Sequence, residues 1–105
     1  MIRLVAIFLA FAGPALAHGL NVFAFVEGEE IVVEAKFASG KLPAAGEVRV
    51  FDGAETLLTV IEITEPAPIR LPLEGVPSET GLLIEVDAGN GHTDYWILTP
   101  EDLAE

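Results

Sequence analysis

Apolar and polar residues alternate along most of the chain, and this alternation predicts β-strands rather than helices. In residues 30–38, every second side chain from Ile31 to Phe37 is apolar, and the positions between them include Glu34 and Lys36. A strand points successive side chains to opposite faces, so a period of two gives one buried face and one solvent face. Six further segments carry a similar pattern, namely 20–26, 47–52, 56–64, 68–74, 82–88 and 93–99.

Turn-forming residues separate these segments and indicate the fold class. They include the pair Asn90-Gly91, which is typical of a tight hairpin because both residues tolerate a positive φ. Seven short strands spaced about ten residues apart predict an all-β fold, a single immunoglobulin-like β-sandwich. Pro68 and Pro72 place the segment 68–74 at the edge of a sheet, because a proline has no N–H to donate to a neighbouring strand. Only residues 100–104 suggest a helical turn.

The aromatic residues are expected to contribute to the core. Tyr95 and Trp96 are adjacent in a predicted strand and therefore point to opposite faces. We expect at least one of them to pack inside the sandwich, together with Phe23 or Phe25.

The first 17 residues have the layout of a secretory signal peptide. Arg3 supplies a positive charge, an apolar run follows, and Ala15 and Ala17 give the small residues of an A-x-A cleavage site. The stretch from Leu4 to Ala17 has 14 residues, fewer than the roughly 20 that a membrane-spanning helix needs. We therefore expect a signal peptide over residues 1–17 and one exported, periplasmic domain over residues 18–105 that does not itself span the membrane.

The composition of this domain narrows the classes of partner. Cleavage removes Arg3 and leaves four basic residues against 17 acidic ones, so the net charge is near 4 − 17 = −13. Such a surface disfavours nucleic acid and anionic lipid, whose phosphates select Lys and Arg. The chain has no cysteine, which excludes disulfides and thiolate metal ligands. No grouping of residues suggests catalysis, and we expect a monomer that is not an enzyme.

Two histidines carry the candidate chemistry. Cleavage after Ala17 would make His18 the first residue, and its α-amine and Nδ1 could then close on one metal ion as a six-membered chelate. His92 follows the turn between the last two predicted strands. If successive strands alternate in direction, this turn lies at the same end of the sandwich as the start of the first strand. The resulting set of three nitrogens, a histidine brace, suits Cu, Ni, Co and Zn rather than Ca or Mg.

Two carboxylates are further candidates at this end. Asp94 comes two residues after His92, so both side chains leave the same face of the last strand. Asp94 could bind the metal through oxygen or orient the His92 ring. Asp87, across the turn, is a weaker candidate for the same role. A plain surface carboxylate is an equal alternative for both.

Two stretches of the sequence carry recognisable motifs. Residues 17–52 open with Ala-His and continue with an Asn-Val-Phe-Ala strand, a Val-Glu-Gly turn and a Ser-Gly-Lys loop. Residues 86–103 contain Ala-Gly-Asn-Gly-His and the final aromatic strand. Both stretches resemble the small periplasmic accessory proteins of nickel and cobalt energy-coupling-factor uptake systems, while residues 53–80 match only in general character. The resemblance implies a periplasmic β-sandwich that assists delivery of Ni²⁺ or Co²⁺ to a membrane metal permease, with His18 and His92 as the matched polar positions.

Two other classes stay open. A periplasmic copper carrier with an N-terminal histidine would use a similar donor set, and Cu²⁺ binds such sites more tightly than Ni²⁺ or Co²⁺. The methionine-rich tracts typical of Cu(I) handling are missing, which favours Ni or Co. A plain adhesion or interaction sandwich would use neither histidine. A copper monooxygenase is more distant, because the 88 residues left after cleavage give little room for a flat polysaccharide-binding face.

Overall fold

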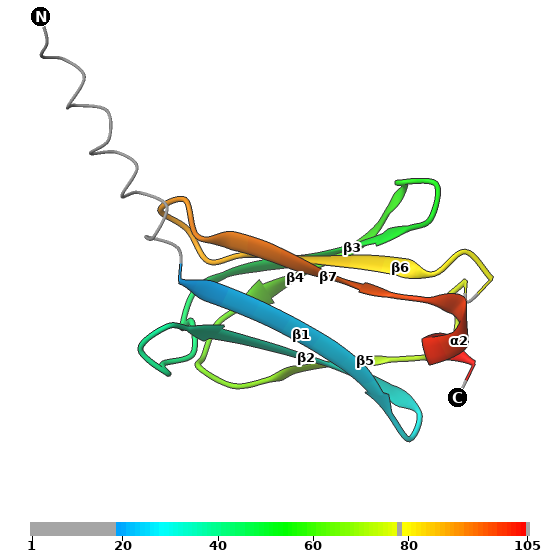
Figure 1. The fold of residues 1–105 in the computed structure, drawn as a ribbon, viewed down its shortest axis with the longest axis horizontal. Coiled ribbons are helices and arrows are strands. Elements are labelled where there is room, and N and C mark those ends of the chain that lie inside the picture. The colour runs from blue at the N-terminus through cyan, green and yellow to red at the C-terminus, as the bar shows by residue number, and fades with distance from the viewer. Residues whose placement is uncertain (1–18, 78, 105) are drawn as a thin grey trace, which may run out of the picture.

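The computed structural model describes residues 19–77 and 79–104, which form seven strands and one short helix (Figure 1). The expected signal peptide, residues 1–17, and His18 lie outside the described residues. Six strands begin and end within one residue of a segment that the alternation predicts, and β5 ends two residues before its segment does, so the expected all-β fold is confirmed. The elements are β1 (Leu20–Glu27), β2 (Glu30–Phe37), β3 (Gly46–Asp52), β4 (Leu57–Ile63), β5 (Ile69–Pro72), β6 (Leu82–Asp87), β7 (Thr93–Leu98) and α2 (Pro100–Leu103).

The strands form two antiparallel sheets that pack face to face (Figure 1). One sheet has three strands in the order β1-β2-β5, and the other has four in the order β4-β3-β6-β7. β5 is an edge strand, as Pro68 and Pro72 predicted, and its other neighbour position is open within the described residues. β1 and β7 are edge strands too, and they run side by side along one flank of the sandwich.

Aliphatic side chains from both sheets fill the core. The inward positions that alternation predicts on β2, from Ile31 to Phe37, are buried or half-buried. Val32 points to the opposite face but is also buried, because Phe25 and Arg70 flank it on the neighbouring strands. Burial of one such aliphatic side chain contributes about 1.5–3 kcal/mol. The fold is therefore held together by this apolar layer.

Phe23, Phe25, Tyr95 and Trp96 lie outside this core, so the expectation that at least one residue of each pair packs inside it is wrong. Tyr95 is 56% exposed, Phe23 46% and Trp96 38%, while Phe25 is half-buried. On β1 the even-numbered residues point inward, which leaves the two phenylalanines on the other face. Trp96 shares the inward face of β7 with Leu98, but β7 is an edge strand and its ring packs against Phe23, with ring centroids 5.0 Å apart.

The two ends of the sandwich differ in what they carry (Figure 1). The start of β1 and the turn between β6 and β7 lie at one end, and α2 lies at the other. α2 begins with a capping box, in which the Thr99 hydroxyl accepts from the Asp102 N–H and the Asp102 carboxylate accepts from the Thr99 N–H. Leu103 is buried and anchors the helix to the core. Among the described residues there is no helix with the length and apolarity to cross a membrane.

Candidate metal-binding site

The turn between β6 and β7 fixes the backbone of His92. Gly89, Asn90 and Gly91 all have a positive φ, at 87°, 54° and 82°, as the Asn-Gly pair predicted. The N–H of His92 donates to the carbonyl of Gly89 at 2.9 Å, and the N–H of Ala88 donates to the carbonyl of His92 at 2.8 Å. The backbone of His92 is thus held at both its donor and its acceptor.

The ring of His92 is held as well, and its hydrogen bond defines which nitrogen can bind a metal. Nδ1 lies 3.1 Å from the carbonyl oxygen of Gly89. A carbonyl oxygen only accepts, so in a neutral ring Nδ1 is the nitrogen that carries the proton and Nε2 is the one with a lone pair. Histidines that bind metals usually donate their other ring N–H to a carbonyl or carboxylate in this way. Nε2 of His92 is therefore the ring nitrogen that this turn leaves available as a possible metal donor.

His92 lies beside the start of β1. Its half-buried ring packs edge-on against Phe37 at the end of β2, with centroids 5.3 Å apart and an interplanar angle of 83°. Phe37 pairs with Leu20, the first residue of β1. The expectation that the start of the first strand and the last turn share one end of the sandwich is therefore confirmed. His18 precedes Leu20 by two residues and lies outside the described part of the chain.

Asp94 links the two sheets. Its Oδ2 accepts a hydrogen bond from the backbone N–H of Val22 at 3.2 Å. Val22 lies on an edge strand, and its N–H points away from β2, the only sheet neighbour of β1 among the described residues. Asp94, from the other sheet, supplies the acceptor that this N–H needs. This contact gives Asp94 a structural role, because it joins β7 to β1.

Asp87 serves the turn and an ion-pair network rather than the ring of His92. Its Oδ1 accepts from the N–H of Gly89 at 2.9 Å, and its Oδ2 lies 3.2 Å from Nη2 of Arg49. The Gly89 N–H and then the Arg49 guanidinium hold the pKa of Asp87 below its usual value. The Arg49 guanidinium also donates to Glu85 and Glu47, each at 2.7 Å. These bonds and the one to Asp87 raise the pKa of Arg49 above its usual value. Both Asp87 oxygens are thus engaged on the turn and on Arg49.

A complete metal site needs donors beyond those that the structure describes. Within residues 19–77 and 79–104, no group of three or more His, Cys, Asp or Glu side chains could hold a metal ion. His92 supplies one oriented imidazole, and Asp94 one carboxylate that already accepts a hydrogen bond. His18 is the candidate for the remaining donors.

Comparisons with protein-family models, with curated proteins and with solved structures gave no match for this chain. Its function is therefore inferred from its own residues and their geometry.

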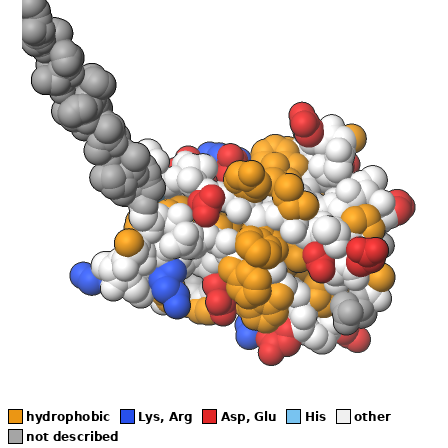
Figure 2. All heavy atoms as spheres, in the orientation of Figure 1, with side chains coloured by type: hydrophobic (Ala, Val, Ile, Leu, Met, Phe, Trp, Pro, Cys, Tyr) orange, Lys and Arg blue, Asp and Glu red, His pale blue; other side chains and the backbone are white. Residues whose placement is uncertain are grey.

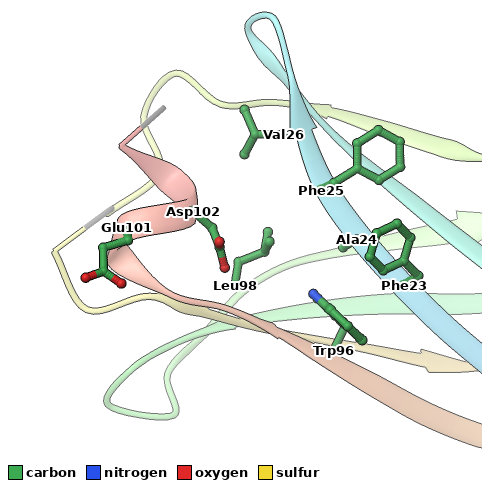
Figure 3. A pocket seen from close by; sticks show the side chains of 8 residues that line it. All are labelled: Phe23, Ala24, Phe25, Val26, Trp96, Leu98, Glu101 and Asp102. Atoms are coloured by element: carbon green, nitrogen blue, oxygen red, sulfur yellow. The ribbon is translucent and has the colours of Figure 1, made fainter.

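A second feature, which the sequence reasoning missed, lies at the opposite end of the sandwich. A groove of about 510 Å³ opens between β1, β7 and α2 (Figure 3). The spacing of Phe23 and Phe25 was the available signal, because both share the parity of the polar positions on β1. The lining residues are Phe23, Ala24, Phe25, Val26, Trp96, Leu98, Glu101 and Asp102, and we call this the seam groove.

Proposed function

We propose that this protein is an exported metal-binding accessory protein that assists uptake of Ni²⁺ or Co²⁺ and passes the ion, as cargo, to a membrane permease. The ion would be bound by the α-amine and Nδ1 of His18 and by Nε2 of His92, with Asp94 as an oxygen ligand or an orienting group. The observation that carries this proposal is the state of the His92 ring. Its Nδ1 is committed to Gly89, so Nε2 is left as a donor at the end of the sandwich where β1 starts.

The length of the chain before β1 supports the pairing of the two histidines. His18 and Leu20 are separated by Gly19 alone. Two residues extend over at most about 7 Å, so the N-terminus of a chain cleaved after Ala17 cannot leave this end of the sandwich. Leu20 in turn pairs with Phe37, which contacts the His92 ring. Little chain entropy would then be lost when His18 closes on a metal ion already bound by His92.

The donor types support a transition metal as cargo. Two imidazoles and an amine suit Ni, Co, Cu and Zn, while Ca and Mg prefer oxygen ligands. Both kinds of nitrogen bind metal only after they lose a proton, so affinity should fall as the pH drops from about 8 to about 5. The net charge of −12 for the full chain would attract cations to the surface in general.

The site is tested by Ni²⁺ titration of five proteins in a calorimeter at neutral pH. These are the parent, His92→Ala, a variant with one glycine inserted before His18, the variant that combines both changes, and Thr93→Ala as a matched control that alters the neighbouring exposed residue. We expect both the insertion and His92→Ala to weaken binding, with Thr93→Ala unchanged. The two losses should be less than additive when combined, because both act on one site. If the insertion variant and His92→Ala both titrate like the parent, the two histidines do not form a metal site.

Two checks make this result unambiguous. The intact mass of the exported protein must correspond to a chain that starts at His18, since a product that retains residues 1–17 has no free amine there. An inserted Gly-His start can also bind Cu²⁺ or Ni²⁺ through its own amine, amide and ring. Residual binding of that type should not respond to His92→Ala in the insertion background, whereas binding at the proposed site should.

A further inference from the structure

We propose that the seam groove binds an extended segment of a partner protein as an added β-strand along Ala24–Val26, and that this segment alternates apolar residues with Lys or Arg. The groove lies at the α2 end of the sandwich, away from His92, and the inference does not depend on metal binding. Three features carry it: the free edge of β1, the aromatic walls, and the charge of the lining.

The backbone of β1 offers unpaired groups to the groove. The N–H of Val22 donates to Asp94 on β7, so it points away from β2. Along a strand, every second residue points its N–H and C=O to the same side, so those of Ala24 and Val26 also point away from β2. β2 is the only sheet neighbour of β1 among the described residues. Addition of a strand along Ala24–Val26 would pair these groups, which is how many domains recognise extended peptides.

The seam between the sheets is open at this point. Nearer His92, the Asp94–Val22 hydrogen bond joins β7 to β1. Towards α2, the groove separates Ala24 and Val26 on β1 from Leu98 on β7 (Figure 3). The opening therefore coincides with the part of the β1 edge that has no side-chain cap.

Aromatic side chains form the walls and provide anchors for a bound segment. Phe23 stacks against Phe25 with centroids 5.4 Å apart and meets Trp96 edge-on at 5.0 Å. Tyr95 and Ile97, each 56% exposed, continue the apolar surface onto the outer face of β7. Figure 2 shows hydrophobic side chains gathered in a stripe across this flank, with acidic side chains beside it. Exposed aromatic clusters of this kind mark protein interfaces more often than chance.

The charge of the groove selects the partner. Glu101 and Asp102 are among its lining residues, which include no Lys or Arg. Arg49 and Arg70 are each paired with at least two carboxylates elsewhere on the described surface. A segment carrying Lys or Arg would gain both from these carboxylates and from the aromatic faces. A second copy of this chain is disfavoured, because each copy has a net charge of −12.

The test uses the purified protein and a blocked synthetic peptide of sequence VKVRV. Trp96 is the chain's only tryptophan, so its fluorescence reports binding at the groove directly. We expect VKVRV to shift the Trp96 emission to shorter wavelength in a saturable titration, while the charge-reversed peptide VEVEV has no effect. A single blocked arginine should bind more weakly than VKVRV, because it forms no strand.

Three variants separate the contributions. Val26→Pro removes one N–H that points into the groove and keeps the pairing of β1 with β2 intact. It should therefore weaken the binding of VKVRV by about tenfold. Phe23→Ala should weaken it by about 30-fold, the loss typical of an aromatic anchor. Glu101→Gln should weaken it by about two- to fivefold, and Glu65→Gln, an exposed residue beyond the far edge strand β4, should change nothing.

Several results would overturn the proposal. If VEVEV binds as tightly as VKVRV, the acidic charge of the groove does not select the partner. If the single blocked arginine binds as tightly as VKVRV, no strand is added to β1. Unchanged affinity in both folded variants, Val26→Pro and Phe23→Ala, would place the peptide elsewhere. Self-association of the parent that is lost in Phe23→Ala would assign the groove to a second copy of the chain.

Discussion

Substitution of Gly46 by alanine should destabilise the sandwich through the same turn that holds His92. Gly46 begins β3 with a φ of 129°, a conformation that side-chain-bearing residues rarely adopt. A Cβ built at this position would overlap the carbonyl oxygen of Asp87 and lie 2.9 Å from Cα of Ala88. Both contacts are with backbone atoms, so the end of β6 would have to move away from β3.

The magnitude follows from two additive contributions. Backbone strain at a glycine-only conformation costs about 1–3 kcal/mol, and displacement of packed backbone costs about 1–3 kcal/mol more. Gly89→Ala is a matched control in the same turn, because its φ is 87° but no atom lies within 4 Å of the added Cβ. The control should show the strain alone. With a shift of about 4–8 °C per kcal/mol for a domain of this size, Gly46→Ala should melt at least about 4 °C below Gly89→Ala.

Thermal unfolding followed by circular dichroism, with calorimetry to test two-state behaviour, measures this difference. A Gly46→Ala protein that melts at or above Gly89→Ala would refute the reasoning, because the close approach of β3 to the β6–β7 turn would then contribute nothing.

Three further outcomes follow from the described contacts. Asp94→Ala should lower the free energy of unfolding by about 1 kcal/mol in urea titrations, because the Val22 N–H loses its acceptor; an unchanged midpoint would mean that Asp94 does not hold the seam. Asp87 has a lowered pKa in the folded state, so its contribution to stability is present above the usual Asp pKa and is lost as the pH falls through the lower folded value; Asp87→Asn should therefore flatten the acid limb of the stability curve, and an acid limb identical to the parent's would contradict this. Chelation with EDTA should leave the far-UV spectrum β-rich, because the core is aliphatic and the candidate metal site is at one end; collapse of that spectrum would make the metal structural.

The strands could be predicted from the sequence because each buried face leaves a period-two signature. The edge position of β5 was equally accessible, since Pro68 and Pro72 lack the N–H that a second neighbour requires. The shared end of the first strand and the last turn followed from the alternation of strand direction, and the Phe37–His92 contact confirms it. In each case a local chemical rule determines the outcome.

The aromatic residues could not be placed by such a rule. Alternation says which side chains share a face, but it does not say which strands end a sheet. β1 and β7 are edge strands, so Trp96 is on the inward face of β7 and is still 38% exposed. The seam groove arises from this arrangement and depends on a contact between residues more than 70 positions apart. Likewise, the tautomer of His92 depends on a single carbonyl, that of Gly89, whose direction only the folded turn defines.

The most direct measurement of the metal hypothesis is paramagnetic line broadening in amide NMR spectra of the exported protein at neutral pH. Substoichiometric Cu²⁺ or Ni²⁺ should broaden the signals of Leu20, Phe37 and His92 first, because these residues surround the proposed site, and should leave Leu103 at the α2 end sharp. His92→Ala should raise the metal concentration that is needed to broaden Leu20 and Phe37, because the ion loses one of its ligands. Broadening that follows the exposed carboxylates instead, or that is the same at Leu20 and Phe37 in His92→Ala, would contradict a site built from His18 and His92.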